Sequence, residues 1–160
     1  TLSGRGGSEL RTDIVLEEVL DAMPDISPRP YFVLRLHPKN TAHELAPYLD
    51  EFDQVSSGGS PLEWLYVADL VVGMTSMSLV EAALLGRPTL SILPQIAEVE
   101  WLPTIRSGIT PCVTTREELR SSIVDMLRDG PATSYANLDN FFVSGSLERA
   151  AETIEGILRR

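Results

Sequence analysis

The sequence predicts an α/β domain built on a doubly wound parallel sheet of five or six strands, with helices on both faces. Short β-branched and aromatic apolar runs alternate along the chain with segments whose apolar residues recur at helical spacing. Glycine, proline and hydroxyl residues separate most of these segments. Strands that alternate with helices pair in parallel through right-handed crossovers. The 160 residues suffice for one such domain, covering 1–160.

The first 40 residues predict a strand stub, a loop, a helix and a buried strand. Thr1 to Ser3 read as the end of a strand that leads into the glycine-rich loop Gly4 to Ser8. Because most of a strand is expected before such a turn, we expect the chain to be a piece of a longer protein. Periodic apolar residues predict a helix from Glu9 to Met23, and β-branched and aromatic residues predict a strand from Tyr31 to Leu36.

Residues 41–68 predict a broken helix, a short strand and a second helix. The helix expected from Thr41 to Phe52 contains Pro47, which breaks or kinks it because proline lacks an N–H. A short strand is expected from Asp53 to Ser56. The turn Ser57 to Ser60 then leads into a helix from Pro61 to Ala68, with proline at a first-turn position that needs no N–H.

The clearest unit of the chain is a strand, turn, helix and strand between residues 70 and 93. Its apolar strands are Leu70 to Val72 and Leu90 to Leu93. The hydroxyl-rich turn Thr75 to Ser78 leads into a helix that ends at Leu85-Gly86. This order is the βαβ unit of a parallel sheet. Residues 95–108 then predict a loop with one helical turn.

The remaining segments predict one strand and three helices. A short strand is expected from Thr110 to Val113. The run Thr115-Arg116-Glu117-Glu118 has the spacing of a capping box and starts a helix that extends to Arg128. A short helix is expected from Ser134 to Phe142, and an amphipathic helix from Ser146 to Arg160.

An anion-binding site is predicted where the helix after Thr75 begins. The first backbone N–H groups of a helix are unpaired and the helix dipole is positive there, which favours a phosphate. Thr75 and Ser76 can donate hydroxyl hydrogen bonds to phosphate oxygens while Ser78 caps the helix. Glu81 can accept from a ribose hydroxyl. In the alternative interpretation, Ser78 and Glu81 form only a capping box, and no ligand is needed.

Two further candidate segments lie after predicted strands, where ligands of open α/β sheets bind. The loop glycines Gly4, Gly6 and Gly7 let backbone N–H groups approach a phosphate, or they form a flexible turn. His37 can donate to a phosphate or act in acid–base chemistry, and Lys39 adds positive charge. Alternatively, both belong to a solvent-exposed loop.

The turn Ser57 to Ser60 is another candidate segment, in which Ser60 can contact a nucleobase or phosphate. Alternatively, it is a plain turn.

Composition narrows the classes of ligand and partner. A metal site is disfavoured, because the sequence has no Cys/His cluster and no close pair of carboxylates beside these segments. The net charge of −10 disfavours nonspecific nucleic-acid binding. No apolar run approaches the roughly 20 residues of a membrane span, and the lone Cys112 favours a reducing, cytoplasmic compartment.

The motifs, in their order along the chain, resemble those of the C-terminal half of GT-B glycosyltransferases. They are also similar to UDP-N-acetylglucosamine 2-epimerases and CDP-glycerol polymer transferases. The resemblance is carried by the glycine-rich loop, the pair His37-Pro38, the turn Ser57 to Ser60 and above all the run Ala68 to Pro88. The chain departs from the epimerases, which have Asp-Ser-Gly-Gly where it has Thr75 to Ser78, and from the polymer transferases, which usually have Asp-Tyr-Ser-Ser there.

The resemblance implies a Rossmann-like domain that binds the nucleotide of a UDP- or CDP-linked sugar in a two-domain protein. It implies that Thr75 to Ser78 hold the diphosphate, Glu81 the ribose and His37 a phosphate, with no cofactor. The missing N-terminal domain normally supplies the acceptor site and the general base, so the chain alone is expected to be inactive. The alternative is a non-catalytic interaction or regulatory domain that has lost the ligand. A third interpretation, a relative of phosphatases or response regulators, is disfavoured because this sequence lacks the clustered aspartates expected of those proteins.

Overall fold

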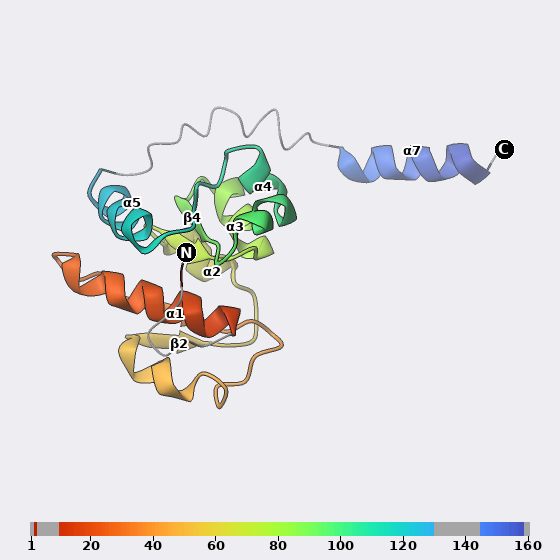
Figure 1. The fold of residues 1–160 in the computed structure, drawn as a ribbon. Helices are drawn as coiled ribbons and strands as arrows, with labels where there is room; N and C mark the ends of the chain where they lie inside the picture. The colour runs from red at the N-terminus through yellow and green to blue at the C-terminus, as the bar shows by residue number, and fades with distance from the viewer. Residues whose placement is uncertain (1, 3–9, 130–144, 159–160) are drawn as a thin grey trace.

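The structure, a computed structural model, is a mixed α/β fold with two short parallel sheets (Figure 1). It describes residue 2, residues 10–129 and residues 145–158. One sheet pairs β1 (Val33–Arg35) with β2 (Gln54–Ser56), and the other has the order β3 (Val71–Gly73), β4 (Thr89–Ile92), β5 (Cys112–Val113). The predicted α/β class and parallel pairing are confirmed. A single doubly wound sheet of five or six strands is not shown by the described residues.

Helices separate the strands in the predicted order. The α-helices are α1 (Arg11–Ala22), α2 (Leu62–Val67), α3 (Met77–Leu84), α4 (Pro103–Arg106), α5 (Arg116–Asp129) and α7 (Ser146–Leu158). The 3₁₀ helices are η1 (Met23–Asp25), η2 (Ala46–Glu51) and η3 (Ile96–Trp101). The short helix expected over residues 134–142 lies outside the described residues. Side chains 146–157 of α7 are exposed, and Figure 1 shows this helix apart from the others.

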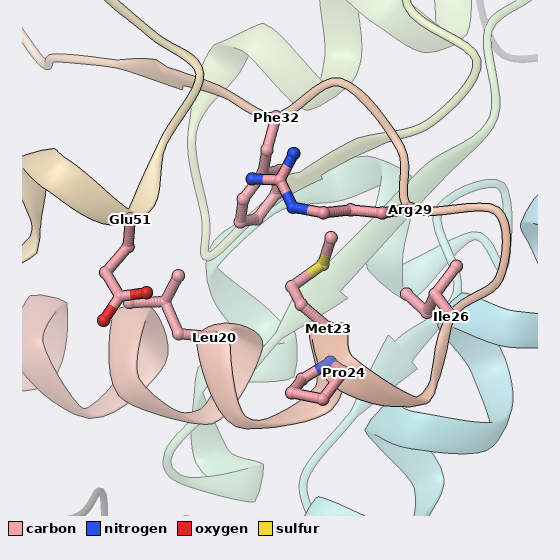
Figure 2. A pocket seen from close by; sticks show the side chains of 7 residues that line it. All are labelled: Leu20, Met23, Pro24, Ile26, Arg29, Phe32 and Glu51. Atoms are coloured by element: carbon pink, nitrogen blue, oxygen red, sulfur yellow. The ribbon is translucent and has the colours of Figure 1, made fainter.

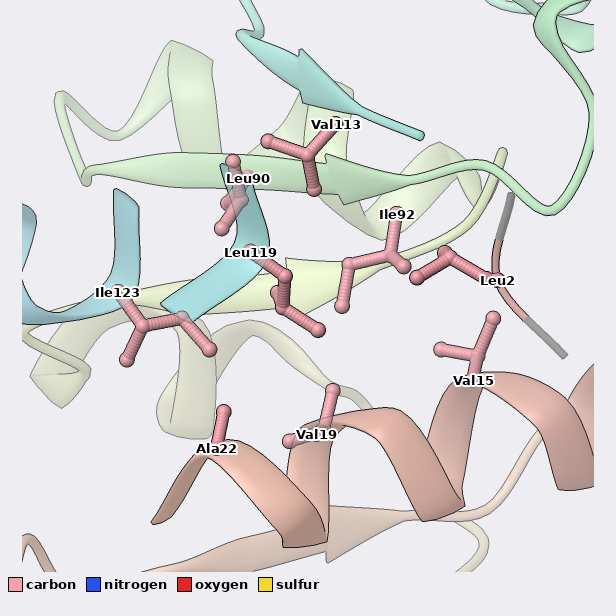
Figure 3. Close-up of a cluster of buried hydrophobic side chains, with 9 residues drawn as sticks. All are labelled: Leu2, Val15, Val19, Ala22, Leu90, Ile92, Val113, Leu119 and Ile123. Atoms are coloured by element: carbon pink, nitrogen blue, oxygen red, sulfur yellow. The ribbon is translucent and has the colours of Figure 1, made fainter. Parts of the chain in front are cut away.

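Helices cover both faces of the β3–β4–β5 sheet because successive strand residues point to opposite sides. On one face, buried β4 side chains pack against α1 and α5 in a cluster drawn in Figure 3: Leu2, Val15, Val19, Ala22, Leu90, Ile92, Val113, Leu119 and Ile123. On the other face, Leu93 packs with Leu79 and Val80 of α3 and with Leu102 and Ile105. Burial of each leucine or isoleucine side chain stabilises the fold by about 1.5–3 kcal/mol. Residues 90–93, in and just after β4, contribute to both clusters, so β4 lies at the centre of this core.

Two carboxylates of α1 are buried together with polar partners. Glu18 is 1% exposed and accepts hydrogen bonds from Nε and Nη2 of Arg116 at 2.7 and 3.0 Å, which joins α1 to α5. The hydroxyl of Tyr48 donates to Oε1 of Glu17 at 2.9 Å, which joins η2 to α1. Since an unpaired buried carboxylate costs several kcal/mol, these contacts set where α5 and η2 lie against α1.

The helix predicted from Thr41 to Phe52 is wrong in type. The backbone instead makes i→i−3 hydrogen bonds, from Glu44 N–H to Thr41 O and from Tyr48 N–H to Leu45 O, and ends in the 3₁₀ helix η2. Pro47 is near the start of η2 and has no N–H to give to an α-helical ladder. Proline therefore does more than kink this helix, because the whole segment adopts the tighter turns.

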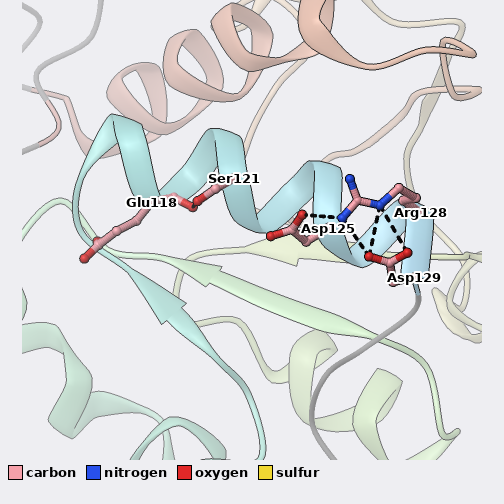
Figure 4. Close-up of polar contacts among 5 residues, drawn as sticks. All are labelled: Glu118, Ser121, Asp125, Arg128 and Asp129. Carbon is pink, nitrogen blue, oxygen red and sulfur yellow. Dashed lines mark hydrogen bonds and ion pairs between the residues drawn. The ribbon is translucent and has the colours of Figure 1, made fainter.

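Side-chain contacts stabilise both ends of α5. At the start, Thr115 Oγ1 accepts the N–H of Glu118 at 3.3 Å, while the Glu118 carboxylate accepts the N–H of Thr115 at 3.2 Å. The predicted capping box is thus confirmed. In the last turn, Arg128 pairs with Asp125 at 3.0 Å and Asp129 at 2.7 Å (Figure 4).

Candidate functional site

Three of the predicted loops leave the sheets at strand carboxyl ends. His37 follows β1, the turn Ser57 to Ser60 follows β2, and Thr75 follows β3. Within each sheet the strands are parallel, so their carboxyl ends share an edge. In Figure 3 the arrowheads of the larger sheet point the same way as that of the strand beneath α1. The loops are therefore on one side of the molecule.

Ser76, rather than Ser78, caps helix α3. Ser76 has extended backbone angles, φ −76° and ψ 143°, and its Oγ accepts the N–H of Ser78 at 3.2 Å. Ser78 is already inside the helix, which begins at Met77. The predicted capping box of Ser78 and Glu81 is therefore wrong, because Glu81 lies a full turn into α3 instead of at its third position.

The first turn of α3 keeps several hydrogen-bonding groups free. Met77 is the first helical residue, so its N–H has no intrahelical acceptor, and no described residue accepts it. The hydroxyls of Thr75 and Ser78 also have no partner among the described residues, and both residues are half-buried. Ser76 is exposed and still has its hydroxyl hydrogen to donate. Together these groups form a small concentration of donors at the positive end of the helix.

Ser91 supports the loop before this helix, and the sequence did not single it out. Its side chain is fully buried, and its hydroxyl donates to the carbonyl oxygen of Met74 at 2.6 Å. The bond ties the end of β3 to the middle of β4 and orients the backbone that leads to Thr75. The one signal in the sequence is a serine inside the apolar run Leu90 to Leu93.

His37 and Lys39 belong to a tight, exposed turn after β1. Nδ1 of His37 accepts the N–H of Lys39 at 3.2 Å, and the backbone carbonyl oxygen of His37 accepts the N–H of Asn40 at 2.8 Å. Both side chains are exposed, so Nε2 of His37 and the ammonium of Lys39 face solvent. Further along, the N–H of Thr41 donates to Glu44, and this bond is the main reason that the pKa of the Glu44 carboxyl is lowered.

Arg35 organises the turn after β2, and it is a cation that sequence reasoning missed. Its guanidinium donates to Ser56 Oγ and to the carbonyl of Gly59, both at 2.8 Å. Gly58 and Gly59 have φ of +64° and +61°, which glycine adopts without strain. Ser60 Oγ accepts the N–H of Leu62 at 3.2 Å and so supports the start of α2. Its hydroxyl hydrogen remains available.

Three of the sequence candidates, Gly4, Gly6 and Gly7, lie outside the described residues. Arg87 lies beyond the C-terminal end of α3, which is about 12 Å along the helix from Ser76. Its guanidinium stacks over the ring of Tyr66 at 5.0 Å. Among the described residues, no group of three or more His, Cys, Asp or Glu side chains is placed to hold a metal ion.

A pocket of about 300 Å³ lies on the opposite edge of the fold. Its wall comes from the end of α1, from η1 and from the segment before β1, including Met23, Ile26 and Phe32 (Figure 2). Arg29 reaches over it and is held by Asp53, with Nη1 2.8 and 2.9 Å from the two carboxylate oxygens. Because Phe32 precedes β1, this pocket borders the amino ends of the strands and is separate from the loops described above.

Comparisons with protein-family models, with curated proteins and with solved structures found no match to this chain. No helix within the described ranges is long and apolar enough to cross a membrane.

Proposed function

We propose that this chain is the nucleotide-sugar binding domain of a GT-B-type glycosyltransferase or a sugar epimerase, with a UDP- or CDP-linked sugar as its ligand. A second domain of the same protein supplies the acceptor site and the general base, and the chain alone binds the donor without turnover.

The free first turn of α3 is the observation that carries this proposal. The N–H of Met77 and the hydroxyls of Thr75 and Ser78 are unpaired within the described residues, at the carboxyl end of β3. Phosphate oxygens are strong acceptors with negative charge, so they match both these donors and the helix dipole. Glu81 lies one turn further along α3, where it suits a ribose hydroxyl better than a phosphate.

Positive charge near the site is needed because the chain carries a net charge of −10. A nucleoside diphosphate adds about two to three negative charges, and only cations within a Debye length of about 8 Å offset this repulsion effectively. Lys39 and Arg35 lie at or just after the carboxyl end of β1, and Ser76 follows the carboxyl end of β3. His37 adds a hydrogen-bond donor in the same turn.

Calorimetric titration of the full 160-residue chain with UDP, CDP, UDP-N-acetylglucosamine and CDP-glycerol tests the proposal. The decisive variant is Met77→Pro, which removes the free N–H but suits the first position of a helix. Ser76, with ψ of 143°, already has the backbone that a following proline requires. A hydrogen bond to a charged group contributes about 1.5–3 kcal/mol, so Met77→Pro should weaken nucleotide binding by about tenfold or more.

Met77→Ala is the matched control, since it shortens the same exposed side chain and keeps the N–H. It should bind the nucleotide as the parent chain does. Equal affinities of Met77→Pro and Met77→Ala would refute the role of α3. Absence of binding to all four ligands would favour a non-catalytic interaction domain instead.

A further inference from the structure

The pocket beside the amino ends of the strands combines an apolar wall with two charged side chains. Most of the residues that line its volume of about 300 Å³ are apolar: Leu20, Met23, Pro24, Ile26 and Phe32. The others are Arg29 and Glu51, which approach the pocket from different sides in Figure 2. A pocket of this volume is at the lower end of the range for ligand sites, so it suits a small metabolite better than a polymer.

The apolar wall is held in place by the core. Leu20 is 6% exposed, and Ile26 and Phe32 pack against the cluster of Figure 3. The Phe32 ring also stacks on that of Phe52, with the ring centroids 4.8 Å apart. Met23, Ile26 and Phe32 are only half-buried, so part of their apolar surface is left to the pocket. A ligand that covers this surface removes it from water, which favours binding.

Arg29 is fixed at the rim of the pocket and keeps part of its guanidinium unused. Its Nη1 binds both carboxylate oxygens of Asp53, and Oδ2 of Asp53 also accepts the N–H of Phe32 at 2.7 Å. The Phe32 N–H and the Arg29 guanidinium lower the pKa of the Asp53 carboxyl, so this anchor stays charged. Among the described residues, no acceptor meets Nε or Nη2 of Arg29. These two nitrogens can donate a pair of parallel hydrogen bonds to a carboxylate.

Glu51 supplies the opposite charge from the last residue of η2. Its side chain is exposed, and its carboxylate has no hydrogen-bond or ion-pair partner within the part of the chain that the structure describes. The hydrogen bond from Tyr48 to Glu17, at 2.9 Å, joins η2 to α1 and so holds this side of the pocket. The pocket thus offers hydrogen-bond donors from a cation and acceptors from an anion beside one apolar wall.

We propose that this pocket binds a free α-amino acid with a large aliphatic or aromatic side chain. Nε and Nη2 of Arg29 donate to the carboxylate of the ligand, and Glu51 accepts from its ammonium group. The ligand side chain packs on Met23, Ile26 and Phe32. Such a zwitterion has no net charge, so the net charge of −10 on the protein does not oppose its binding. The site is independent of the proposed nucleotide site, which lies at the carboxyl ends of the strands.

Titration of the full 160-residue chain with L-leucine, followed by residue-resolved amide chemical shifts, tests this proposal. The shifts should change at residues 20–32 and at Glu51, but not in the first turn of α3. Two analogues of leucine each lack one charge, since 3-methylbutylamine has no carboxylate and 4-methylpentanoate has no ammonium group. At about 150 mM salt, which screens the charge of the protein, each analogue should bind about tenfold more weakly than leucine or worse.

Two substitutions assign each charge of the ligand to its residue. Glu51→Gln should weaken leucine binding by about tenfold and leave the affinity for 4-methylpentanoate unchanged, because that analogue has no ammonium group. Arg29→Lys keeps a cation beside Asp53 but removes the paired donors. It should therefore weaken leucine binding and leave the affinity for 3-methylbutylamine unchanged. In each variant, the analogue whose affinity does not change shows that the pocket is intact.

Glu63→Gln is the matched control for the loss of one negative charge, since Glu63 is an exposed carboxylate on α2. It should bind leucine as the parent chain does. The proposal is overturned if millimolar leucine leaves the amides of residues 20–32 unshifted, or if leucine and 4-methylpentanoate bind equally well. Equal weakening of leucine binding by Glu51→Gln and Glu63→Gln would also overturn it.

Discussion

Helices α3 and α5 begin with the same sequence pattern but with different structures. Ser78 and Glu81 have the spacing of a capping box, as have Thr115 and Glu118. Only the second pair forms one, with reciprocal bonds of 3.3 and 3.2 Å. In α3, Ser76 takes the cap position, and the first turn keeps donors that no described residue accepts. The first turn of α5 is thus satisfied by its own side chains, whereas that of α3 is not satisfied within the described part of the chain.

The difference arises from where each preceding strand ends. Strand β3 ends at Gly73, and the carbonyl of Met74 is held by buried Ser91, so the chain has turned and started the helix by Met77. Strand β5 ends at Val113, and the Glu118 carboxylate receives the N–H groups of Thr114 and Thr115 at 3.1 and 3.2 Å. A capping motif thus acts only where the tertiary structure lets the helix begin at its serine or threonine.

The largest expected effect is on the free energy of unfolding, when the ion pair that joins the first turn of α5 to α1 is removed. Arg116→Ala removes the guanidinium from the Glu18 carboxylate, which is 1% exposed. Breaking a buried pair costs about 3–5 kcal/mol, but the Arg116 side chain is 49% exposed, so we expect a loss of about 2–3 kcal/mol in urea unfolding.

Arg106→Ala is the control for this prediction, because Arg106 lies 4.0 Å from Glu100 and both side chains are more than half exposed. It should change the free energy of unfolding by less than about 1 kcal/mol. Equal costs for the two substitutions would mean that Glu18 does not hold α5.

The second prediction compares the two caps directly. Thr115→Ala and Ser76→Ala each remove a hydroxyl that accepts a first-turn N–H, so each should lower the free energy of unfolding by about 1 kcal/mol. Ser78→Ala removes a hydroxyl that caps nothing and should change it by less than about 0.5 kcal/mol. Chemical denaturation of the three variants checks this order. A larger loss in Ser78→Ala than in Ser76→Ala would restore Ser78 as the cap.

The smallest expected effect is the pH dependence that the capping box of α5 contributes. The N–H groups of Thr114 and Thr115 and the Thr115 hydroxyl lower the pKa of the Glu118 carboxyl from its ordinary value of 4.5. A depressed carboxyl pKa stabilises the fold above the unfolded value, and this contribution is lost as pH falls from 4.5 through the folded value. Glu118→Gln should therefore lose less stability than the parent chain between pH 6 and about pH 3.

Glu117→Gln controls for the removal of one negative charge from the same turn, since Glu117 is exposed and outside the capping box. Urea titrations at several pH values measure both variants. If Glu117→Gln flattens the acid side of the profile as much as Glu118→Gln does, the capping contacts are not its source.

The sequence alone was sufficient to predict those elements whose structure depends only on neighbouring residues. The strands at residues 33, 54, 71, 89 and 112 start within three residues of their predicted positions, because short β-branched runs between turns leave little choice. Gly86, with φ of +70°, ends α3 where the sequence predicted it, since only glycine adopts this angle freely. Thr115 and Glu118 are three residues apart and meet within a single turn.

The tertiary structure decided what depends on distant segments. Ser76 became the cap because Ser91, on another strand, fixes the backbone before it. Arg35 became part of the candidate site through contacts with Ser56 and Gly59, 21 and 24 residues away. The division of the strands into two sheets depends on which strands pair, and strand pairing is a property of the whole sheet. Apolar spacing along one segment specifies its faces, but hydrogen-bond partners across the sheet and the ends of helices are set by segments far along the chain.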